Sequence, residues 1–115
     1  MPKVLIVEPD DRMRHSIVHV IDDRAALFTA TSAEDAKFIV EEQNLDIVLA
    51  EYILPGLNGL VFFEWLEKVY PNIRRVLMSG DKPEQTHGKS VVQRLTHAFL
   101  HKPFQAEELL MSPQI

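Results

Sequence analysis

The sequence contains no cysteine and no long hydrophobic run. The absence of cysteine excludes disulfide bonds and thiolate metal sites, and it fits a reducing compartment. The first apolar run, residues 4–7, is too short for a signal peptide or a membrane span. The formal net charge of -5 argues against nonspecific binding to nucleic acid. We therefore expect a cytoplasmic protein that contacts neither membranes nor nucleic acid directly.

The composition is that of an ordinary globular domain. Hydrophobic residues make up 46% and charged residues 25% of the 115 residues. A chain of this length can bury a core without disulfide bonds or metal ions. No repeat, low-complexity segment or linker interrupts it, so we expect one domain over residues 1–115.

Short apolar runs alternate with amphipathic stretches along the chain. An apolar residue at every position, as in residues 4–7, is typical of a strand buried on both faces. Thr31 or Ser32 is expected to cap the second of the helices. The pattern predicts strands at residues 4–7, 25–30, 46–50, 73–78 and 98–100 and helices at residues 11–21, 33–40, 60–69 and 105–111. It also predicts a helix from Lys82 that is expected to be ragged, because its middle, residues 87–90, is poor in helix formers.

Alternating strands and helices with short connections predict a three-layer, doubly wound α/β domain, in which helices cover both faces of a parallel sheet. Right-handed crossovers then place the carboxyl ends of the first, third, fourth and fifth strands at one edge. In such folds the functional crevice lies outside those ends. The residues that follow these strands are Glu8, Pro9 and Asp10, then Glu51, then Ser79, and then His101, Lys102 and Pro103.

An acidic cluster, a hydroxyl and a lysine at one edge suit a divalent cation and a phosphoryl group. Carboxylates hold magnesium, whereas hydroxyl and ammonium groups donate hydrogen bonds to phosphate oxygens. The alternative is that polar residues at strand ends only keep the loops solvated. The joint placement of these residues favours a binding site.

Several segments resemble the receiver domains of two-component signalling, in the order of that family: V-L-I-V-E-P-D, D-I-V-L-A-E-Y-I-L-P-G-L-N-G-L, V-L-M-S-G and A-F-L-H-K-P-F. The resemblance covers essentially the whole chain. The second segment is the most specific, because the acceptor position, the Pro-Gly pair and the final glycine keep their usual offsets. The resemblance implies a flavodoxin-like sheet of about five parallel strands in the order 2-1-3-4-5, and a role as a response regulator in a phosphorelay.

The resemblance also implies roles for single residues. Glu51 stands where these domains carry their phosphoacceptor aspartate. Lys102 matches the lysine that contacts the phosphoryl group, and Ser79 matches the switch hydroxyl that turns toward it. Phe99 matches the aromatic rotamer switch of the fifth strand, and Glu8 matches the first residue of the metal-binding acidic pair.

Two positions depart from the pattern of the family. Glutamate at position 51 moves the carboxylate by about 1.5 Å relative to aspartate, and a misplacement of about 1 Å can cost roughly 100-fold in rate. Pro9 stands at the second acidic position and offers no ligand side chain. The remaining candidates for metal ligands are Glu8, Asp10, Glu51 and a backbone carbonyl near Ile53, so we expect weak magnesium binding at best.

The main hypothesis is an atypical receiver, or pseudo-receiver, that acts without phosphorylation and is not an enzyme. It would act by contact with a protein partner, such as an output domain, a histidine kinase or another regulator, and the resemblance implies that the partner binds residues 83–110. The short final helix argues for a monomer or a weak dimer. Glu51 either imitates the phosphorylated acceptor, by pairing with Lys102 and drawing in Ser79, or keeps the crevice charge-balanced in a docking domain.

Two other functions remain open. The first is a working, magnesium-dependent switch that accepts phosphate from a histidine kinase on Glu51 or Asp10. The second is a small metal-dependent phosphohydrolase, for which the sequence offers no nucleophile or base. Magnesium-dependent labelling separates the switch from the pseudo-receiver.

Other polar residues are interpreted as solvated surface. His15 and His19 have a spacing that can hold a metal, but no third ligand lies nearby in the sequence. His101 is interpreted as a surface residue at a strand end, and Arg74 and Arg75 as a solvated strand start. The helix at residues 60–69 is predicted to bury Val61, Phe62, Trp65, Leu66 and Val69.

Overall fold

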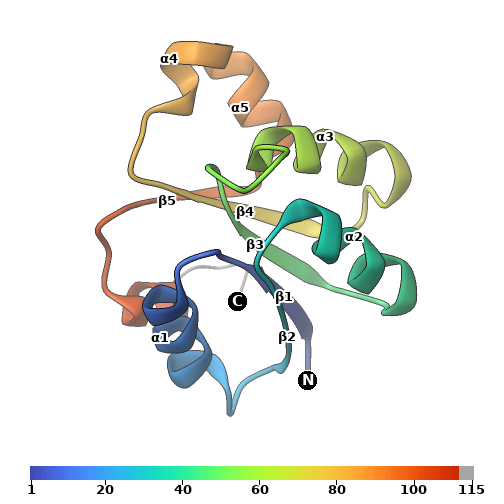
Figure 1. Cartoon of the computed structure of the whole chain (residues 1–115), viewed down its shortest axis with the longest axis vertical. Coiled ribbons are helices and arrows are strands. Elements are labelled where there is room, and N and C mark those ends of the chain that lie inside the picture. Colours follow the sequence, from blue (N-terminus) through green and yellow to red (C-terminus); the bar gives the residue numbers. More distant parts are fainter. Residues whose placement is uncertain (112–115) are drawn as a thin grey trace.

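Five parallel strands form one sheet in the computed structural model of the protein, which describes residues 1–111. The strand order is β2-β1-β3-β4-β5, so the predicted order is confirmed (Figure 1). Every neighbouring pair is parallel. The strands are β1 (Lys3–Val7), β2 (Ala26–Ala30), β3 (Ile47–Glu51), β4 (Arg74–Ser79) and β5 (Ala98–His101).

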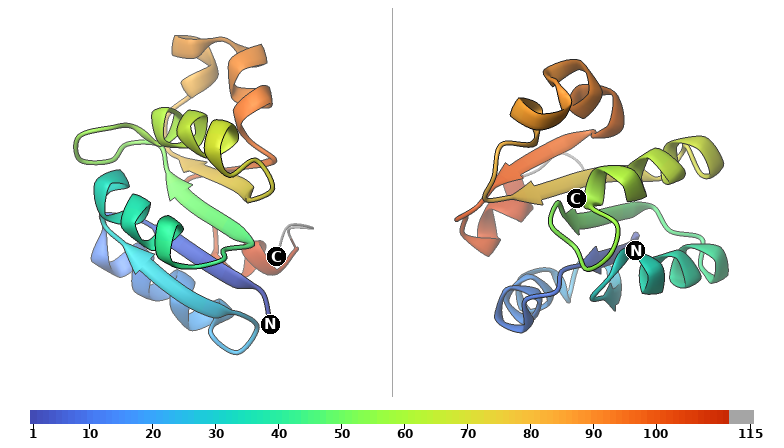
Figure 2. Two further views of the ribbon diagram at one scale, coloured as in Figure 1. Left: turned by 90° about the vertical axis from the view of Figure 1, so that its right-hand side faces the viewer. Right: turned by 45° about the horizontal axis from the view of Figure 1, so that its top comes forward.

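Helices cover both faces of the sheet (Figure 2). Buried side chains from α1 and η1 pack together with one face, and buried side chains from α2, α3 and α5 pack with the other. α4 lies beyond the end of β4, next to α5 (Figure 1). The helices are α1 (Asp11–Ile21), α2 (Ala33–Glu42), α3 (Gly59–Val69), α4 (Pro83–His87), α5 (Lys89–Leu95) and the 3₁₀ helix η1 (Ala106–Met111).

The central strand β1 explains why its sequence is apolar at every position. Val4 and Ile6 belong to the core on the α1 side, whereas Leu5 and Val7 belong to the core on the α2 side. All four side chains have an exposed fraction of 0%. Successive side chains of a strand point to opposite faces, so a strand covered on both faces needs an unbroken apolar run.

Polar caps fix where three of the helices begin. The side chains of Asp10, Ser32 and Asn58 accept hydrogen bonds from the backbone amide of the third residue of α1, α2 and α3, respectively. Each cap satisfies an amide that the first turn of a helix leaves without a partner. The sequence offered Thr31 or Ser32 for α2, and the structure selects Ser32.

Two predictions about individual elements are wrong. Arg75 is buried, with an exposed fraction of 5%, because its Nε donates to the carbonyl of Leu95 at 2.8 Å, at the end of α5. Val61 and Val69 of α3 are 44% and 52% exposed, since the buried face of that helix is centred on Phe62 and Phe63 instead. The final helix, predicted at residues 105–111, is confirmed as a helix, and it is of the 3₁₀ type.

Two features concern the limits of the described chain. The predicted domain extends to residue 115, and its last residues, 112–115, lie outside the part that the structure describes. Within residues 1–111, no helix is both long and apolar enough to cross a membrane.

A glycine separates α4 from α5, where the sequence analysis expected one ragged helix. Gly88 has φ 89° and ψ 147°, a combination that is almost restricted to glycine. The backbone therefore turns at Gly88 and leaves α4 as a separate helix of 5 residues.

Substituting alanine for Gly88 is expected to lower the free energy of unfolding by about 1–3 kcal/mol, because a Cβ disfavours this backbone conformation. A Cβ at this position would meet nothing within 4 Å, so the cost comes from the backbone alone. Chemical denaturation measures the difference, with Gln85→Ala at an exposed position of α4 as the matched control. Equal stabilities of the two variants would contradict the expectation.

Candidate functional site

The carboxyl ends of β1, β3, β4 and β5 bring the predicted site residues together at one edge of the sheet (Figure 1). Glu8 follows β1, Glu51 ends β3, Ser79 ends β4 and Lys102 follows β5. The exposed fractions of Glu8, Glu51 and Ser79 are 1%, 8% and 0%. These polar side chains are thus shielded from water, and their mutual contacts are stronger in the protein interior than they would be in water.

Lys102 lies between the two buried glutamates. Its Nζ is 2.5 Å from Oε1 of Glu8 and 2.8 Å from Oε1 of Glu51. The pairing of Glu51 with Lys102 is the contact that the sequence analysis considered for this glutamate. We call Glu8, Glu51 and Lys102 the ion triad.

The other carboxylate oxygens of the site accept hydrogen bonds from backbone amides. Oε2 of Glu8 accepts from the amide of Asp10 at 3.1 Å, and Oε2 of Glu51 accepts from the amide of Ile53 at 2.8 Å. Oδ1 of Asp10 accepts from the amide of Met13 at 2.8 Å, as the cap of α1. Both glutamates of the ion triad therefore have a donor from the chain itself on each oxygen.

A glycine allows the loop after β3 to approach its own strand. The amide of Gly59 donates to the carbonyl of Tyr52 at 2.6 Å. A Cβ at position 59 would lie 2.5 Å from the carbonyl oxygen of Glu51, which is too close for any other residue. The final glycine of the D-I-V-L-A-E-Y-I-L-P-G-L-N-G-L segment thus fixes the backbone that carries Glu51.

The ion triad raises the pKa of Lys102 above its ordinary value. Burial is the largest single influence and lowers this pKa, but the hydrogen bonds to Glu51 and Glu8 and the attraction of their negative charges together outweigh it. The amide of Lys102 also donates to the carbonyl of Ser79 at 2.8 Å, which ties the loop after β5 to the end of β4. The ammonium is thus the favoured form of Lys102 in the folded protein.

Ser79 does not join the ion triad. Its Oγ accepts from the amide of Asp81 at 2.9 Å. The hypothesis of phosphoryl mimicry expected Glu51 to draw in Ser79, and the contacts of the described residues include no hydrogen bond between these two side chains. The switch role of Ser79 therefore stays a prediction.

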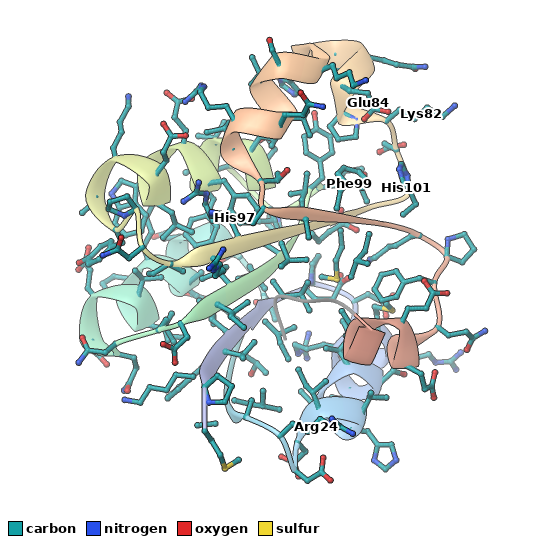
Figure 3. The ribbon with its side chains drawn as sticks, turned by 180° about the vertical axis from the view of Figure 1, so that it is seen from behind. Arg24, Lys82, Glu84, His97, Phe99 and His101 are labelled. Carbon is teal, nitrogen blue, oxygen red and sulfur yellow. The ribbon has the colours of Figure 1, made fainter. Side chains whose placement is uncertain are left out.

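Phe99 lies on β5 beneath the start of α4, near Glu84 (Figure 3). It is partly buried, packs against the core on the α2 side, and has its ring centroid 4.4 Å from that of His101. His101 is exposed, as the sequence analysis interpreted it. An open hollow of about 270 Å³ separates α4 and α5 from β5, and its lining residues are Glu84, Lys89, Val92, Gln93, Thr96, Phe99 and His101.

Sequence reasoning missed two features around the site. Arg14 donates from NH1 to the carbonyl of Glu8 at 2.9 Å and thereby holds the loop after β1. A hollow of about 580 Å³ adjoins Lys102 and is lined by Asp10, Arg12, Met13, Ser16, Gly80, Lys102, Pro103 and Phe104. Both features involve side chains of α1, and the spacing of these residues in the sequence does not indicate a functional site.

The residues of the site do not fit a resident magnesium ion. Among residues 1–111, no group of three or more histidine, aspartate or glutamate side chains is placed to hold a metal ion. Pro9 replaces one carboxylate, and Oδ1 of Asp10 caps α1 instead of facing Glu51. The cation that the two glutamates contact is the ammonium of Lys102.

Replacing Lys102 by methionine is expected to lower the free energy of unfolding by about 3 kcal/mol at neutral pH, because it leaves two buried carboxylates without their cation. The folded-state pKa of Lys102 exceeds 10.5, so its stabilisation is complete below that pH and is lost as the pH rises through the folded-state value. As the pH rises through the alkaline range, the free energy of unfolding should therefore fall more steeply for the wild type than for Lys102→Met.

Lys68→Met is the matched control for this experiment. Lys68 is 70% exposed and lies 3.4 Å from Glu64 on the surface of α3. Its loss should cost less than about 0.5 kcal/mol. If the free energy of unfolding falls equally steeply with alkaline pH in the wild type and in Lys102→Met, the ion triad is contradicted.

Known proteins share this fold and sequence pattern. The hydrogenase transcriptional regulatory protein HoxA of Cupriavidus necator is 23% identical over 107 residues, which cover 93% of this chain and 22% of HoxA. The transcriptional regulatory protein KdpE of Staphylococcus aureus is 29% identical over 115 residues, which cover 93% of this chain and 46% of KdpE. The chain thus spans less than half of the length of these relatives.

The fold itself matches a solved receiver structure. A CheY-like response regulator receiver domain from Methanospirillum hungatei has a TM-score of 0.88 at 18% identity, covering 96% of this chain and 89% of that one. The response regulator receiver domain family matches residues 4–112. The strand order, the residues gathered at the crevice and this match agree, and the chain belongs to the response regulator receiver domain family of two-component signalling.

Proposed function

We propose that this domain is a pseudo-receiver, in which the ion triad replaces metal-dependent phosphoryl transfer and the domain acts by protein contact. The observation that carries the proposal is the position of Lys102, whose ammonium contacts both Glu8 and Glu51. In this arrangement the residue at the acceptor position is bound to a cation of the chain itself.

The geometry of Glu51 argues against efficient transfer. A phosphoacceptor must attack in line while a metal ion neutralises the transferring group. The carboxylate of Glu51 reaches to Lys102 with Oε1 and back to the amide of Ile53 with Oε2. An attacking oxygen would first have to leave one of these partners.

Binding of magnesium would require Lys102 to leave the ion triad. A unit ion pair at about 4 Å is worth roughly 4 kcal/mol before desolvation, at an effective dielectric constant near 20. Removing one partner from a buried pair costs about 3–5 kcal/mol. A cost of about 3 kcal/mol weakens binding by roughly 100-fold. Because Pro9 also has no side chain that could bind the metal, the affinity of the domain for magnesium should be low.

The domain therefore stays in one conformational state, and Ser79 supports an inactive-like state. A phosphorylated receiver resembling this one would turn this hydroxyl toward the phosphate, whereas here Ser79 is engaged with the amide of Asp81. Glu51 in this account balances the charge of the crevice and does not imitate a phosphate.

A protein partner is proposed to bind the surface of residues 83–110. This surface consists of α4, α5, β5 and η1, and it includes the hollow beside Phe99. HoxA and KdpE are transcriptional regulators that are longer than this chain, so we propose a transcriptional output module or another regulator as the partner. The domain acts by contact and not by catalysis, as a monomer or a weak dimer.

The first test is an NMR titration of the backbone amides with magnesium, and then with magnesium and beryllium fluoride, a phosphoryl mimic. The expected result is a nearly unchanged spectrum, because the ion triad already occupies the crevice. Shifts that spread from Glu8, Glu51 and Ser79 to Phe99 would instead show a working phosphoryl switch.

A double variant provides the positive control. Glu51→Asp combined with Pro9→Asp restores a shorter acceptor and a second acid, so the same titration should produce shifts at Ser79 and Phe99. Glu51→Asp alone should respond less, since it lacks the acid at position 9. A silent double variant would show that these two positions are not what prevents the response.

A further inference from the structure

Tyr52 and His87 connect the ion triad to α4. The hydroxyl of Tyr52, the residue after Glu51, lies 2.6 Å from Nε2 of His87, the last residue of α4. The rings meet edge to face, with centroids 5.7 Å apart and planes at 79°. Both residues are partly buried, so their contact is shielded from competing water.

The tyrosine end of this contact is fixed to the site. The amide of Tyr52 donates to the carbonyl of Met78 at 2.8 Å, and the carbonyl of Tyr52 accepts from Gly59 at 2.6 Å. The carboxylate of Glu51 bridges across Tyr52 to the amide of Ile53. Glu51 and the backbone around Tyr52 are therefore joined by hydrogen bonds.

The histidine end belongs to a helix with few other anchors. α4 has 5 residues, and Pro83 is the only one of them that is buried. The start of α4 has no side-chain cap, and its end is capped only by the backbone amide of Gly88, which donates to the carbonyl of Glu84. The contact of His87 with Tyr52 is thus a side-chain hydrogen bond from the last residue of α4 to the rest of the domain.

We propose that the Tyr52–His87 contact is the link through which the ion triad positions α4, and with it the hollow between α4 and β5. Tyr52 and His87 are positioning residues in this role. The inference rests on the proposed function, in which a partner binds this surface. The switch hydroxyl offers no comparable path here, because Ser79 is bound to the amide of Asp81.

The chemistry of the pair suits a permanent link. A neutral imidazole accepts from the tyrosine hydroxyl at Nε2, and an imidazolium donates from Nε2 to the tyrosine oxygen. The hydrogen bond can thus form in either protonation state of His87. Its role is mechanical, and the proposal requires no change of charge at this residue.

The test compares the effect of Glu51→Gln on α4 in two backgrounds. This substitution removes the charge that faces Lys102 while keeping the size of the side chain. The amide resonances of residues 84–88 should shift in the Tyr52 background. The response should fall by more than half in a Tyr52→Phe background, which keeps the ring and removes the hydroxyl. An equal response in both backgrounds, or no response in either, would overturn the proposal.

Hydrogen exchange provides a second readout on single variants. The amide of Gly88, which donates to the carbonyl of Glu84 at 2.9 Å, should exchange about five-fold faster in Tyr52→Phe, the factor that corresponds to a net hydrogen bond. His87→Phe should accelerate it similarly, and His87→Gln, which can still pair with the hydroxyl, should accelerate it less. Unchanged exchange in Tyr52→Phe would contradict the link.

Tyr70→Phe is the matched control, since it makes the same chemical change at the end of α3, where the ring lies 5.6 Å from Trp65. It should leave the α4 amides unaffected. None of these measurements uses magnesium or a phosphoryl mimic. The link can therefore fail while the pseudo-receiver account holds, and the two failures are distinguished by separate measurements.

Discussion

The ammonium of Lys102 is the interaction on which the arrangement of the crevice depends. It joins the loop after β1, through Glu8, to the end of β3, through Glu51. The backbone amide of Lys102 donates to the carbonyl of Ser79 at the end of β4, so this one residue, which follows β5, connects four neighbouring strands of the sheet. Without it, two buried carboxylates would face each other with no counter-charge, which is costly in a medium of low polarity.

In the proposed function, the ammonium of Lys102 takes the place of a metal ion within the receiver fold. The family fold and the residues at the strand ends are present, but the additional methylene of Glu51 carries its carboxylate onto Lys102. Pro9 withdraws a metal ligand at the same place. The proposed docking surface begins at α4, a helix of 5 residues whose last residue, His87, contacts Tyr52.

Much of the fold could be predicted from local patterns. The unbroken apolar run of β1, the cap at Ser32 and the break near Gly88 each have a local physical cause. What the sequence analysis got wrong or missed depends on tertiary contacts. Arg75 is buried because it donates to a carbonyl 20 residues away, and Tyr52 contacts a histidine 35 residues away. For the site, topology and the family resemblance placed Glu8, Glu51 and Lys102 at one edge. The orientation of Ser79 toward Asp81 had no sequence signal.

The most direct test of this account is a pH titration of the side-chain nitrogen of Lys102, observed by NMR. The ion triad predicts an ammonium signal at neutral pH that exchanges slowly with water, and a titration midpoint above the ordinary 10.5. A rapidly exchanging ammonium with a midpoint at or below that value would show that Lys102 is free of the two glutamates. The crevice would then be open to a metal ion, and the central claim would be wrong.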